Sequence, residues 1–306
     1  MTLAVLLSGQ GGQHPGMFDL TADWPAAAPV FAAAERVLGR DPRDLVRAPG
    51  ADLHDNRTGQ ILCCVAAQAG WTVVEAARPA RVVAGYSIGD LAAWGCAGRF
   101  DAETILRLAA ARAEAMDAAS GEGFGLAGLR GLPLARIEAL AERHGCHLAI
   151  RNAADSAVVG GAEAALEALC SEARAAGAAR AVILAVRTPS HTPLLAEASR
   201  HFDEILRRET PQRPQPGAPR LISGLDGATV FNTEAGLAKL TRQIAHTIDW
   251  AACLEACREY GSDTVLELGP GHALATMARD LTPQWRVHAL DEFRSAAGAA
   301  AWIGSA

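Results

Sequence analysis

A serine held between two glycines is the clearest candidate for covalent chemistry in this chain. The pentapeptide G-Y-S-I-G at 85–89 follows a short apolar run and precedes a segment that favours a helix. Strand, tight G-x-S-x-G turn and helix together form a nucleophile elbow, which lifts the serine hydroxyl out of its sheet. Glycine permits a turn too tight for side chains, and the start of the helix directs N–H groups towards developing negative charge. We therefore predict that Ser87 is a nucleophile.

A serine nucleophile needs a general base, and two of the nine histidines lie in suitable loops. His191 follows an apolar run at the start of a predicted helix, and His272 ends the segment G-P-G-H after another apolar run. The hydrolase order of serine, acid and histidine would be met by Ser87, by Asp263 or Asp249, and by His272. Spacing alone leaves both histidines as candidate bases.

Two further features could bind negative charge. The loop G-Q-G-G-Q at 9–13 follows the first apolar run, and His14 stands where a dinucleotide fingerprint needs its third glycine. The loop is either a structural turn or the source of a backbone N–H, at Gln10, for an oxyanion. Arg112 lies in a helical stretch of small residues. It is either an exposed arginine paired with a glutamate or a planar fork for a substrate carboxylate.

Apolar runs alternate with helical segments along the chain, which predicts an α/β fold. Strands are expected at 3–7, 81–84, 220–223 and 264–268. Helices are expected at 26–38, 58–77, 90–94, 102–118, 192–208, 234–247 and 250–260. Between residues 125 and 186 the order is strand, helix, strand, strand, helix, strand, a ferredoxin-like pattern.

We therefore predict a parallel-sheet body formed by 1–123 and 188–306, with a small α+β subdomain at 124–187. The tail at 295–306 is rich in small residues and is expected to be loosely held.

Composition excludes several functional classes. The chain has 306 residues, of which 50% are hydrophobic, and its net charge of −6 comes without a basic run. Nucleic acid and membrane surfaces are therefore not expected partners. The longest apolar runs, 61–67 and 181–186, are too short to span a bilayer, and the first residues do not form a secretory signal. Seven cysteines without a C-x-x-C pair indicate free thiols in the cytoplasm.

Taken together, the motifs resemble those of the malonyl-CoA:acyl carrier protein acyltransferase family. Residues 8–13 resemble its P-G-Q-G-S-Q, and residues 85–90 resemble its G-H-S-L-G-E. Arg112 with Met116 resembles its R-x-x-x-M, and the segments at 189–191 and 267–271 resemble its P-S-H and E-x-G-P-G. The resemblance implies a hydrolase-like α/β body that carries a ferredoxin-like insert.

The resemblance also implies how the histidine works. His191 matches the family's catalytic base, which pairs with the serine and is held by a backbone carbonyl in place of a carboxylate. That carbonyl is expected from the loop at 246–250. Asp249 stands where the family commonly has glutamine, so it is expected to support the site, as is Gln60.

The remaining roles that the resemblance implies concern the substrate. The backbone N–H groups of Gln10 and Ile88 would stabilise the oxyanion, and Arg112 would bind the free carboxylate of malonyl. No cofactor or metal is expected, because a malonyl ester on Ser87 carries the acyl group between two thiols.

A closer resemblance is to the malonyl transferase (epsilon) subunit of biotin-independent malonate decarboxylase. It rests on Tyr86 before the serine and on the segments 56–64 and 92–98. It implies transfer of malonyl from malonyl-CoA to the phosphopantetheine-type thiol of a carrier subunit, with other decarboxylase subunits as further partners. The alternatives are a malonyl-CoA:acyl carrier protein transacylase of fatty acid or polyketide synthesis, a serine esterase or thioesterase, and a non-catalytic docking subunit.

Overall fold

Five parallel strands form the main sheet in the computed structural model, which describes residues 2–305. Their order across the sheet is β10-β9-β1-β2-β7. The strands are β1 (Leu3–Leu7), β2 (Val82–Gly85), β7 (Arg220–Ile222), β9 (Thr264–Leu268) and β10 (Arg286–Ala289). Because neighbouring strands are parallel, their carboxyl ends meet at one edge. The glycine-rich loop after β1 and the serine turn after β2 are therefore neighbours.

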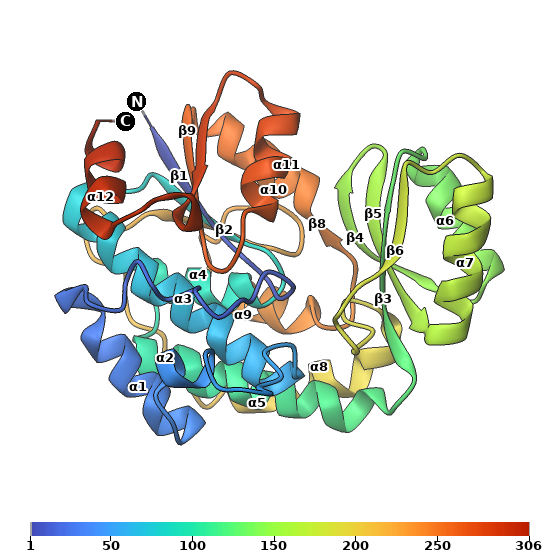
Figure 1. Ribbon diagram of the computed structural model, residues 1–306, viewed down its shortest axis with the longest axis horizontal. Coiled ribbons are helices and arrows are strands. Elements are labelled where there is room, and N and C mark those ends of the chain that lie inside the picture. The colour runs from blue at the N-terminus through green and yellow to red at the C-terminus, as the bar shows by residue number, and fades with distance from the viewer. Residues whose placement is uncertain (1, 306) are drawn as a thin grey trace.

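Helices cover both faces of the main sheet (Figure 1). One face is covered by α1 (Ala28–Leu38), α3 (Asn56–Ala77), α4 (Ile88–Cys96), α5 (Ala102–Ser120) and α8 (Ala196–Leu206). The other face is covered by α10 (Trp250–Glu259) and α11 (Ala273–Leu281). Side chains of β1 alternate between these two cores, as a strand buried on both faces requires. Further helices of the body are α2 (Pro42–Leu45), α9 (Thr233–Arg242) and α12 (Ala296–Gly304). Single 3-10 turns occupy Pro25–Ala27, Pro193–Leu195 and Leu290–Glu292.

The central helix α3 is long and apolar enough to cross a membrane by length and composition alone. Inside this fold, however, 78% of its most apolar window is buried. It packs against α4, α5 and α12, so it is the core helix of the body. It corresponds to the helix that the sequence predicts at 58–77.

A second sheet stands apart from the first (Figure 1). Its strands β3 (Phe124–Arg130), β4 (His147–Ala153), β5 (Ser156–Ala162) and β6 (Arg180–Ile183) are antiparallel. Helices α6 (Leu134–Arg143) and α7 (Glu163–Ala175) pack on it and enclose a separate core. The strand order β6-β3-β5-β4 is ferredoxin-like, so the predicted fold class is confirmed.

One strand of the body extends the small sheet. The two-residue strand β8 (Ile248–Asp249) pairs in parallel with β4, with Ile150 opposite Ile248. Strand β8 lies outside the segment 124–187, which we keep as the proposed extent of the small subdomain. The small sheet is thus linked to a segment of the body by backbone hydrogen bonds as well as by the chain crossings.

Two sequence predictions, one about the tail and one about a helix end, were wrong. The tail forms α12, and its buried residues Ala299 and Ile303 pack in the same core as α3, so the described residues 295–305 are not loose. Ala306 lies outside the described residues. The helix expected at 234–247 ends at Arg242, because the residues after it turn to reach β8. This early end brings Gln243 to the edge of the sheet where Ser87 lies, as described next.

Candidate active site

The turn between β2 and α4 holds Ser87 in a strained conformation. Its φ of 57° and ψ of −120° are rare for a residue with a side chain. A Cβ at Gly85 would collide with the backbone of Gly89, and a Cβ at Gly89 would collide with the carbonyl of Leu7. Glycine is therefore required on both sides of the serine. The serine itself is half-buried, at the carboxyl edge of the main sheet.

His191 lies within hydrogen-bond distance of this serine. Its Nε2 is 2.8 Å from Ser87 Oγ, and its Nδ1 is 2.5 Å from the backbone carbonyl oxygen of Gln243. A carbonyl can only accept, so Nδ1 carries the proton and Nε2 is free to accept from the serine hydroxyl. The imidazole is only 1% exposed. Burial, with the charge of Arg112 nearby, lowers the pKa of His191 to about 3, so the ring is neutral and able to act as a base.

The carbonyl that holds the histidine comes from Gln243, not from the loop at 246–250 as the family resemblance implied. Asp249 accepts a hydrogen bond from Ala252 N at 3.0 Å at the start of α10, and its other oxygen lies 3.9 Å from Arg151. The predicted support of His191 by Asp249 is therefore wrong. The pairing of β8 with β4 takes Asp249 to the edge of the small sheet instead.

The alternative acid and base of the hydrolase order lie elsewhere. His272 is exposed at the start of α11. Asp263 precedes β9, so it lies at the amino end of the strands, where it accepts a hydrogen bond from Thr2 N at 2.8 Å. Ser87 lies at the carboxyl end. The structure thus brings Ser87 together with His191 and leaves Asp263 at the opposite edge of the sheet.

A buried polar network that sequence reasoning missed surrounds Gln243. Its side-chain amide donates to the carbonyl of Ser87 at 3.3 Å and to Asp90 Oδ2 at 3.0 Å. The same carboxylate oxygen accepts from Gly224 N at 3.1 Å. Burial raises the pKa of Asp90 to about 7. One residue therefore joins the base, the nucleophile and a buried acid, and this fixes the direction of the carbonyl that orients His191.

Arg112 is buried beside the Ser87–His191 pair. It lies on α5, is 1% exposed, and donates from Nη1 to Gln60 Oε1 on α3 at 2.6 Å. Gln60 is itself held, since its amide donates to Asn56 Oδ1 at 2.9 Å. The Nε and Nη2 atoms of the guanidinium have no partner among the residues that the structure describes. Burial lowers the pKa of Arg112 to about 10, so it stays charged near neutral pH.

The two unpartnered nitrogens form one side of the guanidinium fork. That side matches the two oxygens of a carboxylate in a bidentate geometry. A buried charge with open donors is costly unless an anion pairs with it. The exposed arginine paired with a glutamate, which was the alternative from sequence, is excluded by the burial of Arg112.

The expected oxyanion donors lie at the same edge of the sheet. Ile88 is the first residue of α4, so its N–H has no carbonyl partner within the helix. Gln10 lies in the loop after β1, and Gly9 next to it is so close to the elbow that an added Cβ would lie 3.0 Å from the Tyr86 carbonyl oxygen. The loop before Gln10 therefore contacts the turn that carries Ser87.

A buried glutamate secures this loop. Ser8 Oγ donates to Glu267 Oε1 at 2.6 Å, and Ala275 N donates to Glu267 Oε2 at 2.7 Å. Burial raises the pKa of Glu267 to about 7. Glu267 thus ties the loop after β1 to the end of β9 and the start of α11.

Within residues 2–305, no group of three or more histidine, cysteine or acidic residues is arranged to hold a metal ion.

Comparison with known proteins gives consistent results. A family model described as an acyl transferase domain matches residues 5–284. The malonyl CoA-acyl carrier protein transacylase of Escherichia coli K12 is 30% identical over 301 residues, covering 94% of this chain and 96% of that protein. The protein of the same name from Mycobacterium tuberculosis H37Rv is 28% identical over 288 residues, covering 90% and 92%.

Solved structures agree over nearly the whole chain. The acyl-carrier-protein S-malonyltransferase from Burkholderia pseudomallei superimposes with a TM-score of 0.90 at 28% identity, covering 98% of this chain and 100% of that one. A malonyl-transacylase in complex with its type II PKS acyl-carrier protein gives 0.91 at 27% identity, covering 98% and 99%.

Proposed function

Because the chain belongs to the acyl transferase family, we propose that it moves malonyl from malonyl-CoA to the thiol of an acyl carrier protein. The acyl group would travel as a malonyl ester of Ser87. The observation that carries this proposal is the buried Arg112, whose open fork lies close enough to influence the Ser87–His191 pair. A free carboxylate next to a thioester is the feature that such a site would select.

In the first half of the reaction Ser87 Oγ attacks the thioester carbonyl while His191 Nε2 takes the proton of the serine hydroxyl. The N–H groups of Ile88 and Gln10 would stabilise the oxyanion, and loss of one such donor typically costs ~2.7–4 kcal/mol. The C–S bond then breaks, and the sulfur of CoA leaves with the proton from His191. The malonyl ester remains on Ser87 while Arg112 holds its carboxylate.

The second half uses the same groups in reverse. The carrier's phosphopantetheine thiol gives its proton to His191 and attacks the ester carbonyl. When the ester bond breaks, Ser87 regains a proton from His191 and the malonyl thioester departs with the carrier. The Gln243 carbonyl would hold the ring in one tautomer throughout, which lets it accept and return the proton at the same nitrogen.

The identity of the carrier separates two forms of this proposal. The sequence markers favoured the carrier subunit of malonate decarboxylase, with the other subunits of that enzyme as partners. The relatives are named as acyl carrier protein transacylases, and one solved neighbour is bound to its acyl carrier protein. We therefore propose an acyl carrier protein of fatty acid or polyketide synthesis as acceptor. Seven free, buried cysteines support a cytoplasmic location.

Radiolabelled malonyl-CoA would test the proposal. The purified protein is incubated with the label and either a holo acyl carrier protein or a malonate decarboxylase carrier subunit, with Ser87→Ala as control. Label on the first carrier, absent with the control variant, is expected. Label on the second carrier alone would restore the decarboxylase reading. Rapid release of free malonate would favour an esterase, and equal transfer by Ser87→Ala would leave only a docking role.

A further inference from the structure

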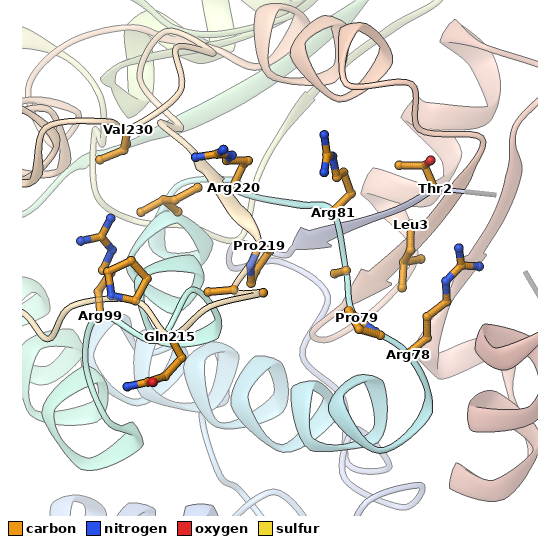
Figure 2. A pocket seen from close by; sticks show the side chains of 15 residues that line it. Thr2, Leu3, Arg78, Pro79, Arg81, Arg99, Gln215, Pro219, Arg220 and Val230 are labelled. Atoms are coloured by element: carbon orange, nitrogen blue, oxygen red, sulfur yellow. The ribbon is translucent and has the colours of Figure 1, made fainter.

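A cavity lined by four arginines lies at the amino edge of the main sheet (Figure 2). Its volume is about 560 Å³, within the range of small-molecule sites. The arginines come from separate segments: Arg78 and Arg81 before β2, Arg99 after α4, and Arg220 at the start of β7. The mechanism proposed above uses none of them.

The cavity is distinct from the candidate active site. Arg81 directly precedes β2 and Ser87 lies in the turn after it, so the length of a four-residue strand, about 13 Å, separates them. The two features therefore lie at opposite ends of the same strand. Backbone pairing joins the walls, because Arg220 N donates to the carbonyl of Arg81 at 2.9 Å.

Three of the arginines in this cavity, Arg81, Arg99 and Arg220, carry charge that no lining residue balances. None of its lining residues is acidic, although the chain as a whole carries a net charge of −6. Within residues 2–305, Arg81, Arg99 and Arg220 form no ion pair with a carboxylate. Arg99 donates to the Thr233 hydroxyl at 3.1 Å, and Arg220 lies 6.0 Å from the ring centre of Phe231. The positive charges of these arginines repel each other, and an anion bound in the cavity would offset that repulsion.

The wall opposite the strands is formed by a proline-rich loop. Pro214 and Pro219 lie in it, and proline restricts the backbone to few conformations. Gln212 N donates to the carbonyl of Arg99 at 2.8 Å, and Ala218 N donates to that of Gln215 at 3.0 Å. The cavity is therefore preorganised for a ligand, which lowers the entropy cost of binding.

We propose that this cavity binds a small molecule that carries two or more linked phosphoryl groups. A single carboxylate presents one planar edge, which one guanidinium fork satisfies. Linked tetrahedral phosphoryl groups present acceptor oxygens in several directions, so they can meet guanidinium groups that come from three segments at once. The net positive lining complements their charge. This site is independent of the acyl transfer proposed at Ser87.

Isothermal titration of the full chain with inorganic tripolyphosphate tests the proposal. Binding of one molecule per chain is expected, with citrate and sulfate binding at least about tenfold more weakly. The variant Arg81→Gln/Arg220→Gln removes two charged donors, so its affinity should fall about a hundredfold, since each charged hydrogen bond is worth about tenfold. Arg220→Gln alone, whose side chain is exposed, should lose about tenfold and serves if the pair fails to fold.

The matched control is Arg200→Gln/Arg258→Gln, which removes the same charge from two exposed ion pairs. It should keep the affinity of the unmodified chain, as should Ser87→Ala. If this control lost as much affinity for tripolyphosphate as the cavity variant, the effect would depend on net charge alone and the proposal would be overturned. Absence of saturable binding, or citrate binding as tightly as tripolyphosphate, would also overturn it.

Discussion

Replacing Arg112 should invert the preference between malonyl-CoA and acetyl-CoA. The side chain offers two unpartnered donors, Nε and Nη2, in a buried position. A hydrogen bond to a charged group is worth about 1.5–3 kcal/mol, so two of them give about 3–6 kcal/mol. In Arg112→Ala the rate constant kcat/KM for malonyl-CoA should therefore fall about 10²- to 10⁴-fold. Acetyl-CoA has no carboxylate, so its rate should hold or rise.

Two companion variants separate recognition from damage to the fold. Arg112→Ala leaves Gln60 Oε1 without its donor at 2.6 Å, which can lower stability by itself. The double variant Arg112→Met/Gln60→Met removes both polar partners and keeps the volume. Arg112→Lys keeps the charge and loses the planar fork, so it should lose most of the malonyl preference.

The assay is the rate of acyl-enzyme formation with each thioester, measured on variants whose urea unfolding shows a folded protein. An unchanged ratio of malonyl to acetyl rates in the folded Arg112→Ala and double variants would refute carboxylate recognition by this arginine. A parallel fall in both rates would indicate instead that the guanidinium acts through the neighbouring His191.

Three other predictions concern the same edge of the sheet. His191→Ala should abolish acyl-enzyme formation while His272→Ala leaves it near the unmodified rate, and stopped-flow release of CoA would reveal the opposite order if the hydrolase reading were correct. Burial raises the pKa of Asp90 from 3.8 to about 7, so the stability that this group contributes is fully present below pH 4 and is lost as pH rises through 7. Asp90→Asn should therefore flatten the pH dependence of urea unfolding by up to about 4 kcal/mol between pH 4 and 8, and an unchanged slope would contradict the burial argument. Gly89→Ala would drive a methyl group into the carbonyl of Leu7, so it should destabilise the fold by about 1–3 kcal/mol or more, and a variant of unchanged stability would show that the elbow can relax.

Local patterns in the sequence predict those parts of the fold that local chemistry specifies. The strand Leu3–Leu7, the turn at Ser87 and helix α5 follow from apolar runs and turn residues close to them. The end of α9 does not, because the pairing of β8 with β4 determines it from outside the segment. The tail shows the same effect. Its alanines have little individual hydrophobicity, and they form a helix because they can approach α3 closely.

The same distinction holds for the candidate sites. Ser87 and Arg112 stand in recognisable motifs, so the sequence and the family resemblance could name them as candidates before their surroundings were known. Gln243 became visible only when the turn after α9 placed its carbonyl against His191. The arginine-lined cavity could not be predicted at all, because its four arginines come from three segments that only the sheet brings together.

The central claim is that Ser87 carries the malonyl group. Intact-protein mass spectrometry after brief exposure to malonyl-CoA tests it most directly, with peptide fragmentation to locate the added group. We expect a gain of one malonyl group at Ser87, its loss on addition of holo acyl carrier protein, and no gain in Ser87→Ala. An unmodified mass in the presence of a competent donor, or an acyl group on any other residue, would contradict the account.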